Sequence, residues 1–584
     1  MPLLSLLFTL LYLPLFHLGI TFAEHSNSLS WLFTWVFSGA PAAATAVLVG
    51  AFLFKLKNDV KESLIFALLF FFCTLYLSYS VFLSHHLLAG FLITAAFYIL
   101  WFHKDKSLFL LLAGLSCGSA IFIDPPPGAA FSAAFFFYLL LSRTPLFRIA
   151  FFALAASLPV IANSIASLSA FGTLMPPNID PQYFQYYGAA FDESNLSGAV
   201  MNNSLRLLLP YAFHCLIGYR GLFSYTPLLF FALWGGLEAY KSRQRRGLLF
   251  AAIISAVIFT AYYFWRTNNL GGDSYGIRFL LPIVPLLFIM LAFVWERIKT
   301  HRIRRWFTIA AIWSFIVALV GLYRPASDAD LGINSFAANL FHFQTYAFPS
   351  LSRFTWKPLA ALSGYDPNIT AFIGETMLTA GALEPARDAL NSARDADSSN
   401  FRANINLGNI AFKSAVQRTD YDAAIRFFRA ANPHLHPQLL LSLAATFQAQ
   451  GESDSSNLCV NRYLALGDSI TPTIPQPLVA AGLGFYSHSA KDKALALLTE
   501  NYLTKNLLDS ARSALEQMSP DFLKIESAVL VKTKFLLRSG DHQSALQLLQ
   551  NAAPINPGLR RSVLADPELS LLENEIKWNE ESGR

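Results

Sequence analysis

Residues 271–285 read GGDSYGIRFLLPIVP, a polar, glycine-rich loop that passes directly into an apolar segment expected to be a membrane helix. The loop carries a carboxylate at Asp273, a phenol at Tyr275 and a guanidinium at Arg278. A charge at the mouth of a membrane helix is costly to keep there unless it is paired or used. This loop is therefore the leading candidate for a functional site.

The composition indicates a membrane domain followed by a soluble domain. Hydrophobic residues make up 54% and charged residues only 14% of the 584 residues, which is too apolar for a soluble protein of this length. The apolar excess ends near residue 322, after which the sequence is polar and rich in alanine. We predict a transmembrane domain (1–322), a linker (323–365), a soluble helical domain (366–560) and a C-terminal tail (561–584).

About eleven apolar runs in the first domain are predicted to cross the membrane as helices. They fall near residues 3–22, 30–54, 63–83, 86–102, 107–123, 127–141, 147–166, 222–240, 247–265, 277–295 and 303–322. The first run lacks the basic start of a secretory signal, so an uncleaved span fits it better than a signal peptide. Three prolines at 125–127 predict a tight turn between two spans.

Basic residues in the short loops predict the orientation, because Lys and Arg favour the cytoplasmic side. They cluster in alternate connections, at Lys55, Lys57, Lys61, Lys104, Lys106, Arg143, Arg148, Lys241, Arg243, Arg245, Arg246, Arg297, Lys299, Arg302, Arg304 and Arg305. One assignment satisfies all of them, with the N-terminus in the cytoplasm and everything after about residue 323 outside. The net charge of +6 thus comes from basic residues in the loops predicted to be cytoplasmic, and no nucleic-acid partner is expected.

Cysteine and histidine spacing gives no metal pattern. Cys215 and Cys459 can form a disulfide only if both face an oxidising compartment. His85 and His86 are adjacent, and neighbouring residues on a helix point about 100° apart and rarely bind one ion. No third ligand stands at helical spacing, so no metal and no other cofactor is predicted, although a divalent ion is compatible with the sequence.

Residues 366–560 show a pattern of helical pairs. A small or turn residue is followed five positions later by Ala or Ser at Gly381 and Ala386, Thr419 and Ala424, Gly451 and Ser456, Ser489 and Ala494, and Gly540 and Ala545. These positions resemble the tetratricopeptide repeat, in which small residues let two helices approach closely. An unrelated helical array is the alternative. Such arrays bind peptides or proteins, so we expect this domain to recruit a protein partner or acceptor.

Three blocks, taken in order, resemble the bacterial GT-C-type membrane glycosyltransferases related to the family 39 protein mannosyltransferases. They are YSVFLSHH at 79–86, YRGLFSYTPLL at 219–229 and the 271–285 loop, and the resemblance covers about residues 60–300. It implies location in the bacterial inner membrane, a polyprenyl-phosphate sugar donor entering from the lipid, and an acceptor arriving on the periplasmic side. The chemistry would need a carboxylate to take the acceptor proton and cations to hold the leaving phosphate.

The candidate residues all fall on the predicted outer side. Glu24, Asp124 and Asp273 are the candidate catalytic carboxylates, and the candidates for binding lipid phosphate or substrate are Arg278, Arg220, Tyr275, His86 and Arg266. Structural alternatives are open for five of them. Asp124 can cap a turn, Asp273 can pair with Arg278 or Arg266, and Arg220 can anchor the interface. Arg278 can snorkel to the interface or pair with Asp273, and His86 can be a hydrogen-bonded histidine at a helix end.

One departure from the family pattern matters. The family's usual carboxylate lies in a long first outer loop within an acidic pair, whereas the loop at 23–30 is short and Glu24 is its only acid. Either Glu24, Asp124 or Asp273 substitutes, or an upstream segment supplies the residue, or the protein has lost activity.

The sequence thus predicts an all-α chain, a polytopic membrane domain followed by a tetratricopeptide-like domain. The predicted function is transfer of a sugar from a polyprenyl-phosphate donor to an acceptor on the periplasmic side. The alternative is a non-catalytic membrane scaffold that kept the fold and binds partners through its repeats. A transporter fits less well, because no inverted repeat is visible.

Overall fold

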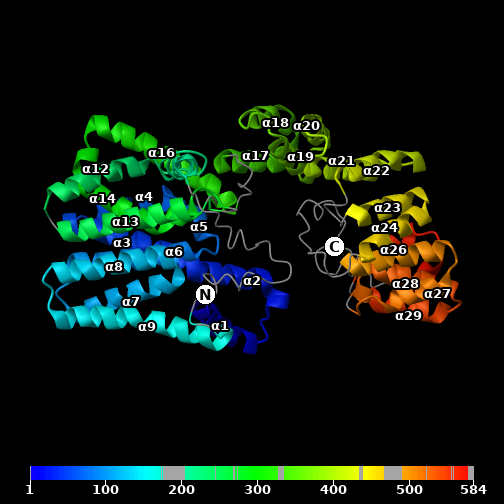
Figure 1. Cartoon of the computed structure of the whole chain (residues 1–584), viewed down its shortest axis with the longest axis horizontal. Coiled ribbons are helices and arrows are strands. Elements are labelled where there is room, and N and C mark those ends of the chain that lie inside the picture. Colours follow the sequence, from blue (N-terminus) through cyan, green and yellow to red (C-terminus); the bar gives the residue numbers. More distant parts are fainter. Residues whose placement is uncertain are drawn as a thin grey trace. The chain divides into compact units, whose positions relative to one another are not determined.

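The computed structural model describes residues 2–172, 174, 204–243, 245–267, 270–271, 274–326, 334–432, 439–465, 490–520, 522–553, 556 and 558–576. Over these residues the chain contains helices and no β-strand, which confirms the predicted all-α class. It divides into two compact units, Met1–Phe343 and Gln344–Arg584 (Figure 1). The division falls within α17 (Ser335–Ala347), inside the segment predicted as a linker.

The helices of unit 1 follow the predicted apolar runs. They are α1 (Pro2–His17), α2 (Phe22–Thr34), the π-helical turn η1 (Trp35–Gly39), α3 (Ala40–Lys57), α4 (Val60–Phe72), α5 (Leu75–Ser80), α6 (His85–Phe102), α7 (Ser107–Ile123), α8 (Pro125–Leu141), α9 (Leu146–Phe171), α10 (Leu205–Leu216), α11 (Leu222–Tyr225), α12 (Leu228–Lys241), α13 (Arg246–Arg266), the 3-10 helices η4 (Arg278–Ile283) and η5 (Leu291–Phe293), α14 (Val284–Met290), α15 (Trp295–Ile298) and α16 (His301–Tyr323).

Five helical segments of the described chain are long and apolar enough to cross a membrane. They are His25–Lys57, His85–Phe102, Leu146–Ser169, Arg246–Arg266 and His301–Tyr323. Other apolar runs, such as Ser107–Ile123 and Pro125–Leu141, form shorter helices. The membrane character is therefore supported, while the count of eleven spans stays a prediction.

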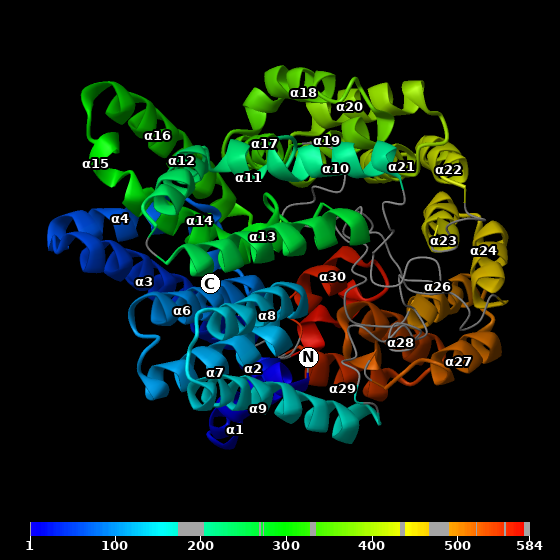
Figure 2. The ribbon, with the colours of Figure 1, turned by 60° about the vertical axis from the view of Figure 1, so that its left-hand side comes forward.

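Glycines let α7 and α9 pack very closely, and the two helices lie side by side in Figures 1 and 2. A Cβ on Gly114 would lie 2.2 Å from the Phe152 carbonyl oxygen, and one on Gly118 would lie 2.0 Å from that of Ala156. These two glycines stand four residues apart on one face of α7. Small residues at this spacing allow membrane helices to approach at backbone contact distance.

The sequence suggested that the 271–285 loop continues into one regular helix, and the structure shows that it does not. It enters the 3-10 helix η4, then the seven-residue α14, and then η5. Pro282 and Pro285 explain the interruption, because proline has no N–H and cannot join the α-helical hydrogen-bond ladder. Leu281, Phe288 and Leu291 are fully buried, so this broken segment lies in the core of unit 1.

An ion-pair network joins four elements at one end of unit 1. Glu296 of α15 pairs with Lys57 at 3.3 Å and with Lys299 at 3.0 Å. Glu238 of α12 pairs with Arg297 at 3.2 Å, and Glu62 of α4 pairs with Lys299. Three of the basic clusters predicted to be cytoplasmic therefore meet at the same end of the helices.

Unit 2 is a series of helix pairs that stack in chain order (Figure 1). After η7 (Pro349–Leu351) and α18 (Ser352–Ala361) come α19 (Pro367–Thr379), α20 (Leu383–Ala396), α21 (Phe401–Ser414), η8 (Arg418–Asp420), α22 (Tyr421–Ala430), α23 (Leu439–Gln450), α24 (Ser453–Ala465), α26 (Ala490–Thr504), α27 (Leu508–Glu516), η10 (Phe522–Lys524), α28 (Glu526–Arg538), α29 (His542–Ala552), α30 (Leu559–Ala565) and η11 (Ser570–Glu575).

The small residues of the predicted repeat pattern lie inside this stack. All five are fully buried, namely Ala386, Ala424, Ser456, Ala494 and Ala545. The turn glycines Gly381, Gly451 and Gly540 have φ values of +82°, +90° and +84°, a conformation that favours glycine. The pattern thus marks helix-pair packing, while its assignment to the tetratricopeptide family stays a prediction.

All four cysteines are free thiols, and each is buried within its own unit.

Candidate functional site

The three blocks that carried the family resemblance meet at the end of unit 1 opposite the ion-pair network. The first block supplies the start of α6, the second the turn between α10 and α11, and the third the loop before η4. Gly271 lies where the last two come together. An ideal Cβ on this glycine would be 3.5 Å from Cγ of Arg278 and 3.7 Å from Nη1 of Arg220. Two arginines 58 residues apart in sequence therefore flank one glycine.

Arg220 is held inside the protein. Its side chain is fully buried, and Nη1 donates hydrogen bonds to the Leu270 carbonyl at 2.9 Å and to Ser274 Oγ at 3.2 Å. Burying a guanidinium is expensive unless hydrogen bonds and charges compensate for lost water. These contacts fix the guanidinium in place at the start of the 271–285 loop.

Arg278 is more open than Arg220. Its side chain is half-buried at the first position of η4, and its guanidinium carbon lies 5.6 Å from the centre of the Phe279 ring. The Nε atom is buried and makes no hydrogen bond to any residue that the structure describes. Because a guanidinium offers a planar fork of donors, Arg278 is suited to binding an anion beside it.

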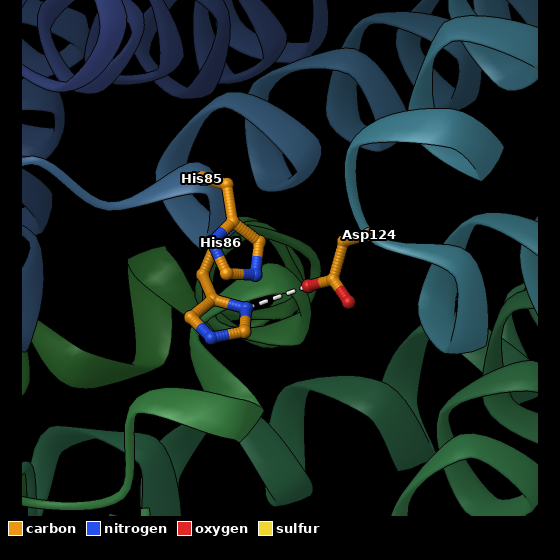
Figure 3. A group of neighbouring side chains, drawn as sticks. All are labelled: His85, His86 and Asp124. Carbon is orange, nitrogen blue, oxygen red and sulfur yellow. Dashed lines mark hydrogen bonds and ion pairs between the residues drawn. The ribbon is translucent and has the colours of Figure 1, made fainter. Parts of the chain in front are cut away.

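A histidine and a carboxylate from different helices form a buried pair next to these arginines (Figure 3). Nδ1 of His86 lies 2.6 Å from Oδ2 of Asp124, and both residues are at most 3% exposed. An ionised carboxylate can only accept in this hydrogen bond. The Phe279 ring lies 6.0 Å from the His86 ring and 5.6 Å from the guanidinium carbon of Arg278, so this ring lies next to both the pair and the cation.

The prolines after Asp124 explain why its carboxylate is available. Asp124 stands at the N-cap of α8, yet its side chain makes no capping hydrogen bond. An N-cap carboxylate normally accepts from the N–H groups two or three residues later. Those positions are occupied by Pro126 and Pro127, which have no N–H. Of the two alternatives raised by the sequence, the turn cap is therefore wrong.

Aromatic rings pack between the arginine and the carboxylate. Phe279 makes an edge contact with His86 at 6.0 Å and stacks on Tyr263 of α13 at 4.6 Å between ring centres. The Tyr263 phenol interacts electrostatically with Asp124. Tyr263, Phe279 and Ser274 were not among the residues that the sequence predicted for the site. The one sequence signal for Tyr263 is its position one turn before the predicted outer end of α13.

The remaining candidates lie in different settings. Tyr275 is fully buried, and its hydroxyl donates to the Val317 carbonyl at 2.6 Å, a contact that ties the loop to α16. Arg266 is exposed at the last position of α13. Glu24 belongs to α2, although its side chain is not among the described ones, and Asp273 lies outside the described residues.

Unit 1 also holds an apolar groove of about 540 Å³. Its lining includes Leu222, two residues after Arg220, and Leu280, two residues after Arg278. It follows α12 and α13, and on α13 it extends from Phe264 to Leu249, a length of about 22 Å along the helix axis. The groove thus runs along most of the length of α13.

Neither family models, nor curated proteins, nor solved structures give a match to this chain.

Proposed function

We propose that this protein transfers a sugar from a polyprenyl-phosphate donor to an acceptor on the outer side of a bacterial inner membrane. The observation that carries the proposal is the buried Asp124–His86 pair, which shares the Phe279 ring with Arg278, while Arg278 and Arg220 flank Gly271. An apolar groove in the same unit is lined by Leu222 and Leu280, close in sequence to the two arginines. An amphipathic donor needs these three features, which are cations for its phosphate, a carboxylate near the sugar, and an apolar path for its lipid chain.

In this proposal each group has one task. Arg278 binds the phosphate with its fork of N–H donors, and the fixed Arg220 adds positive charge behind it. Asp124 accepts the proton of the acceptor hydroxyl as its oxygen bonds to the anomeric carbon. The bond from that carbon to the phosphate oxygen breaks, and the lipid phosphate leaves with the electron pair and stays paired with Arg278. His86 positions the carboxylate through the 2.6 Å hydrogen bond.

A second groove supports the recruiting role proposed for unit 2. It has a volume of about 800 Å³ and is lined mainly by α23, α26 and α28, the first helices of successive pairs. Lys534 pairs there with Glu500 at 2.7 Å and with Asp566 at 2.6 Å, between apolar residues such as Leu497 and Leu530. A surface that mixes apolar and charged groups suits a peptide, which fits an acceptor or a partner protein. The same surface would serve the scaffold alternative.

Transfer assays in proteoliposomes test the proposal. The protein is incubated with a panel of radiolabelled polyprenyl-phosphate sugars and membrane extract as the source of acceptor. We expect transfer from one donor, and a loss of about 100-fold or more in Asp124→Asn and Arg278→Met. Arg206→Met, at an exposed position on α10, is the matched control and should retain activity. Activity in all variants equal to that of the wild type would place the chemistry elsewhere, and no transfer from any donor would favour the scaffold.

A further inference from the structure

His85, His86 and Asp124 bring three metal-ligand side chains together. One nitrogen from each imidazole and one carboxylate oxygen all lie within 4.8 Å of one another. Figure 3 shows the two rings and the carboxylate turned toward one another, with the histidines at the start of α6 and Asp124 between α7 and α8. Helical spacing could not reveal this group, because its third member belongs to another element.

We propose that His85, His86 and Asp124 form a binding site for a divalent transition metal of the Zn²⁺ class. Metal–nitrogen and metal–oxygen bonds of about 2.0–2.2 Å place tetrahedral ligand atoms about 3.3 Å apart. The widest separation must therefore close by about 1.5 Å, and the 2.6 Å contact between His86 and Asp124 must open slightly. Both changes are within the reach of side-chain rotation, and the ring centres of the histidines are already 4.1 Å apart.

The surroundings decide which class of metal fits. The site offers two imidazoles and one carboxylate, and the Arg278 guanidinium exerts a positive field on it. Ca²⁺ and Mg²⁺ depend on several oxygen ligands and on negative charge, which this site does not supply. Zn²⁺ and Co²⁺ bind imidazole nitrogen well, and three protein ligands leave one position open to water or an anion.

The outer contacts also suit a metal site. Asp124 is held by the backbone turn before Pro125, and the Tyr263 phenol interacts with its carboxylate. Contacts from neighbouring groups to a metal ligand fix the orientation of that ligand and raise the affinity of the site for the metal. His85 is exposed, so an ion can reach the two buried ligands from its side. The site shares His86 and Asp124 with the proposed transfer, so Asp124 is a ligand while the ion is bound and a base only without it, but ion binding does not depend on that reaction.

Metal titration of the full-length protein tests the site without any sugar donor. The purified protein, treated with chelator, is titrated with Co²⁺, and the visible absorption of the bound ion is followed. We expect saturation at one equivalent and displacement by Zn²⁺. Loss of a residue that only supports a metal ligand typically weakens metal binding by about 10- to 100-fold. His85→Ala and Asp124→Asn each remove a ligand, so each should weaken Co²⁺ binding by at least that factor.

His301→Ala removes an exposed histidine at the start of α16 and is the matched control, which should bind like the wild type. The proposal is overturned if the wild type shows no saturable binding, or if His85→Ala binds as tightly as the wild type. His85 is exposed, so this variant should fold even if Asp124→Asn does not. Sugar transfer without metal binding would discard the metal site alone, and metal binding without transfer would discard only the proposed reaction.

Discussion

At the scale of single residues, Gly271 has a φ of +104°, which residues with a Cβ rarely adopt. A methyl group there would also lie 2.7 Å from Ser274 Oγ, which accepts a hydrogen bond from Arg220. Gly271→Ala should therefore lower stability by about 1–3 kcal/mol and displace the Arg220 guanidinium. We expect a lower apparent melting temperature in detergent and a raised KM for the donor in the transfer assay.

Gly172→Ala is the control for Gly271. It has a φ of +72°, but an added Cβ would meet no atom within 4 Å. The control should show backbone strain without loss of donor binding. If both variants bind the donor alike, the close packing around Gly271 does not position the arginines.

Lys493, in the groove of unit 2, should make stability depend on pH. Burial lowers its pKa to about 8, whereas an unfolded chain gives about 10.4. Between these values the unfolded chain holds a proton that the folded chain has released, so this residue makes stability rise with pH from about 8 to about 10.4. Below pH 8 the Lys493 amine is protonated in both the folded and the unfolded chain, so the full cost of burying its charge lowers the stability of the folded state.

Thermal unfolding of wild type and Lys493→Met at pH 7.5 and pH 10 checks this. The stability of the wild type should improve relative to the variant as the pH rises. Lys491→Met changes an exposed lysine on the same helix and should leave the pH dependence of the wild type unchanged. An equal rise in wild type and Lys493→Met would contradict the lowered pKa.

At the scale of elements, two adjacent glycines in α12 have opposite roles. A Cβ on Gly235 would lie 2.0 Å from the Met290 carbonyl oxygen of α14, while one on Gly236 would have only Met290 Cγ at 3.9 Å nearby. The missing side chain of Gly235 therefore allows α12 and α14 to come into contact, whereas a side chain at Gly236 would not obstruct that contact. The position on the helix face, and not the residue type, decides the effect of substitution.

Substitution of each glycine by alanine separates these roles. Gly235→Ala should destabilise the protein by about 1–3 kcal/mol or more, because α12 and α14 are pushed apart. Gly236→Ala should be neutral or stabilising by up to about 1 kcal/mol, because alanine favours the helix. Unfolding of the two variants in the same detergent gives the comparison. Similar melting temperatures would mean that the α12–α14 contact is not as close as described.

At the scale of the whole molecule, the predicted orientation can be tested because the four native cysteines are buried and give little background. Val416 of unit 2 is 91% exposed, and the Lys241 side chain at the ion-pair end of unit 1 is 70% exposed. With the C-terminal unit outside, an impermeant maleimide should label Val416→Cys in intact spheroplasts and Lys241→Cys only after permeabilisation. The reverse labelling would invert the orientation and remove the periplasmic site.

The sequence by itself determined the helical class, the membrane character of the apolar part and the pairing of helices in unit 2. Each of these depends on local pattern, since hydrophobic runs and small residues act within one helix or between neighbours. It also identified Asp124, His86, Arg220 and Arg278 individually, because charged groups between apolar runs are costly and easily noticed.

Only the tertiary structure decided which of these residues meet. The contact of Asp124 with His86 spans 38 positions, and that of Arg220 with Ser274 spans 54, so no local pattern encodes either one. The 277–295 run breaks at Pro282 and Pro285, which have no N–H, and within it the Leu281 carbonyl accepts a hydrogen bond from the distant Tyr76 hydroxyl at 3.4 Å. Convergence of distant residues is a property of packing, because helices choose their neighbours by shape across the whole unit and not by spacing along the chain.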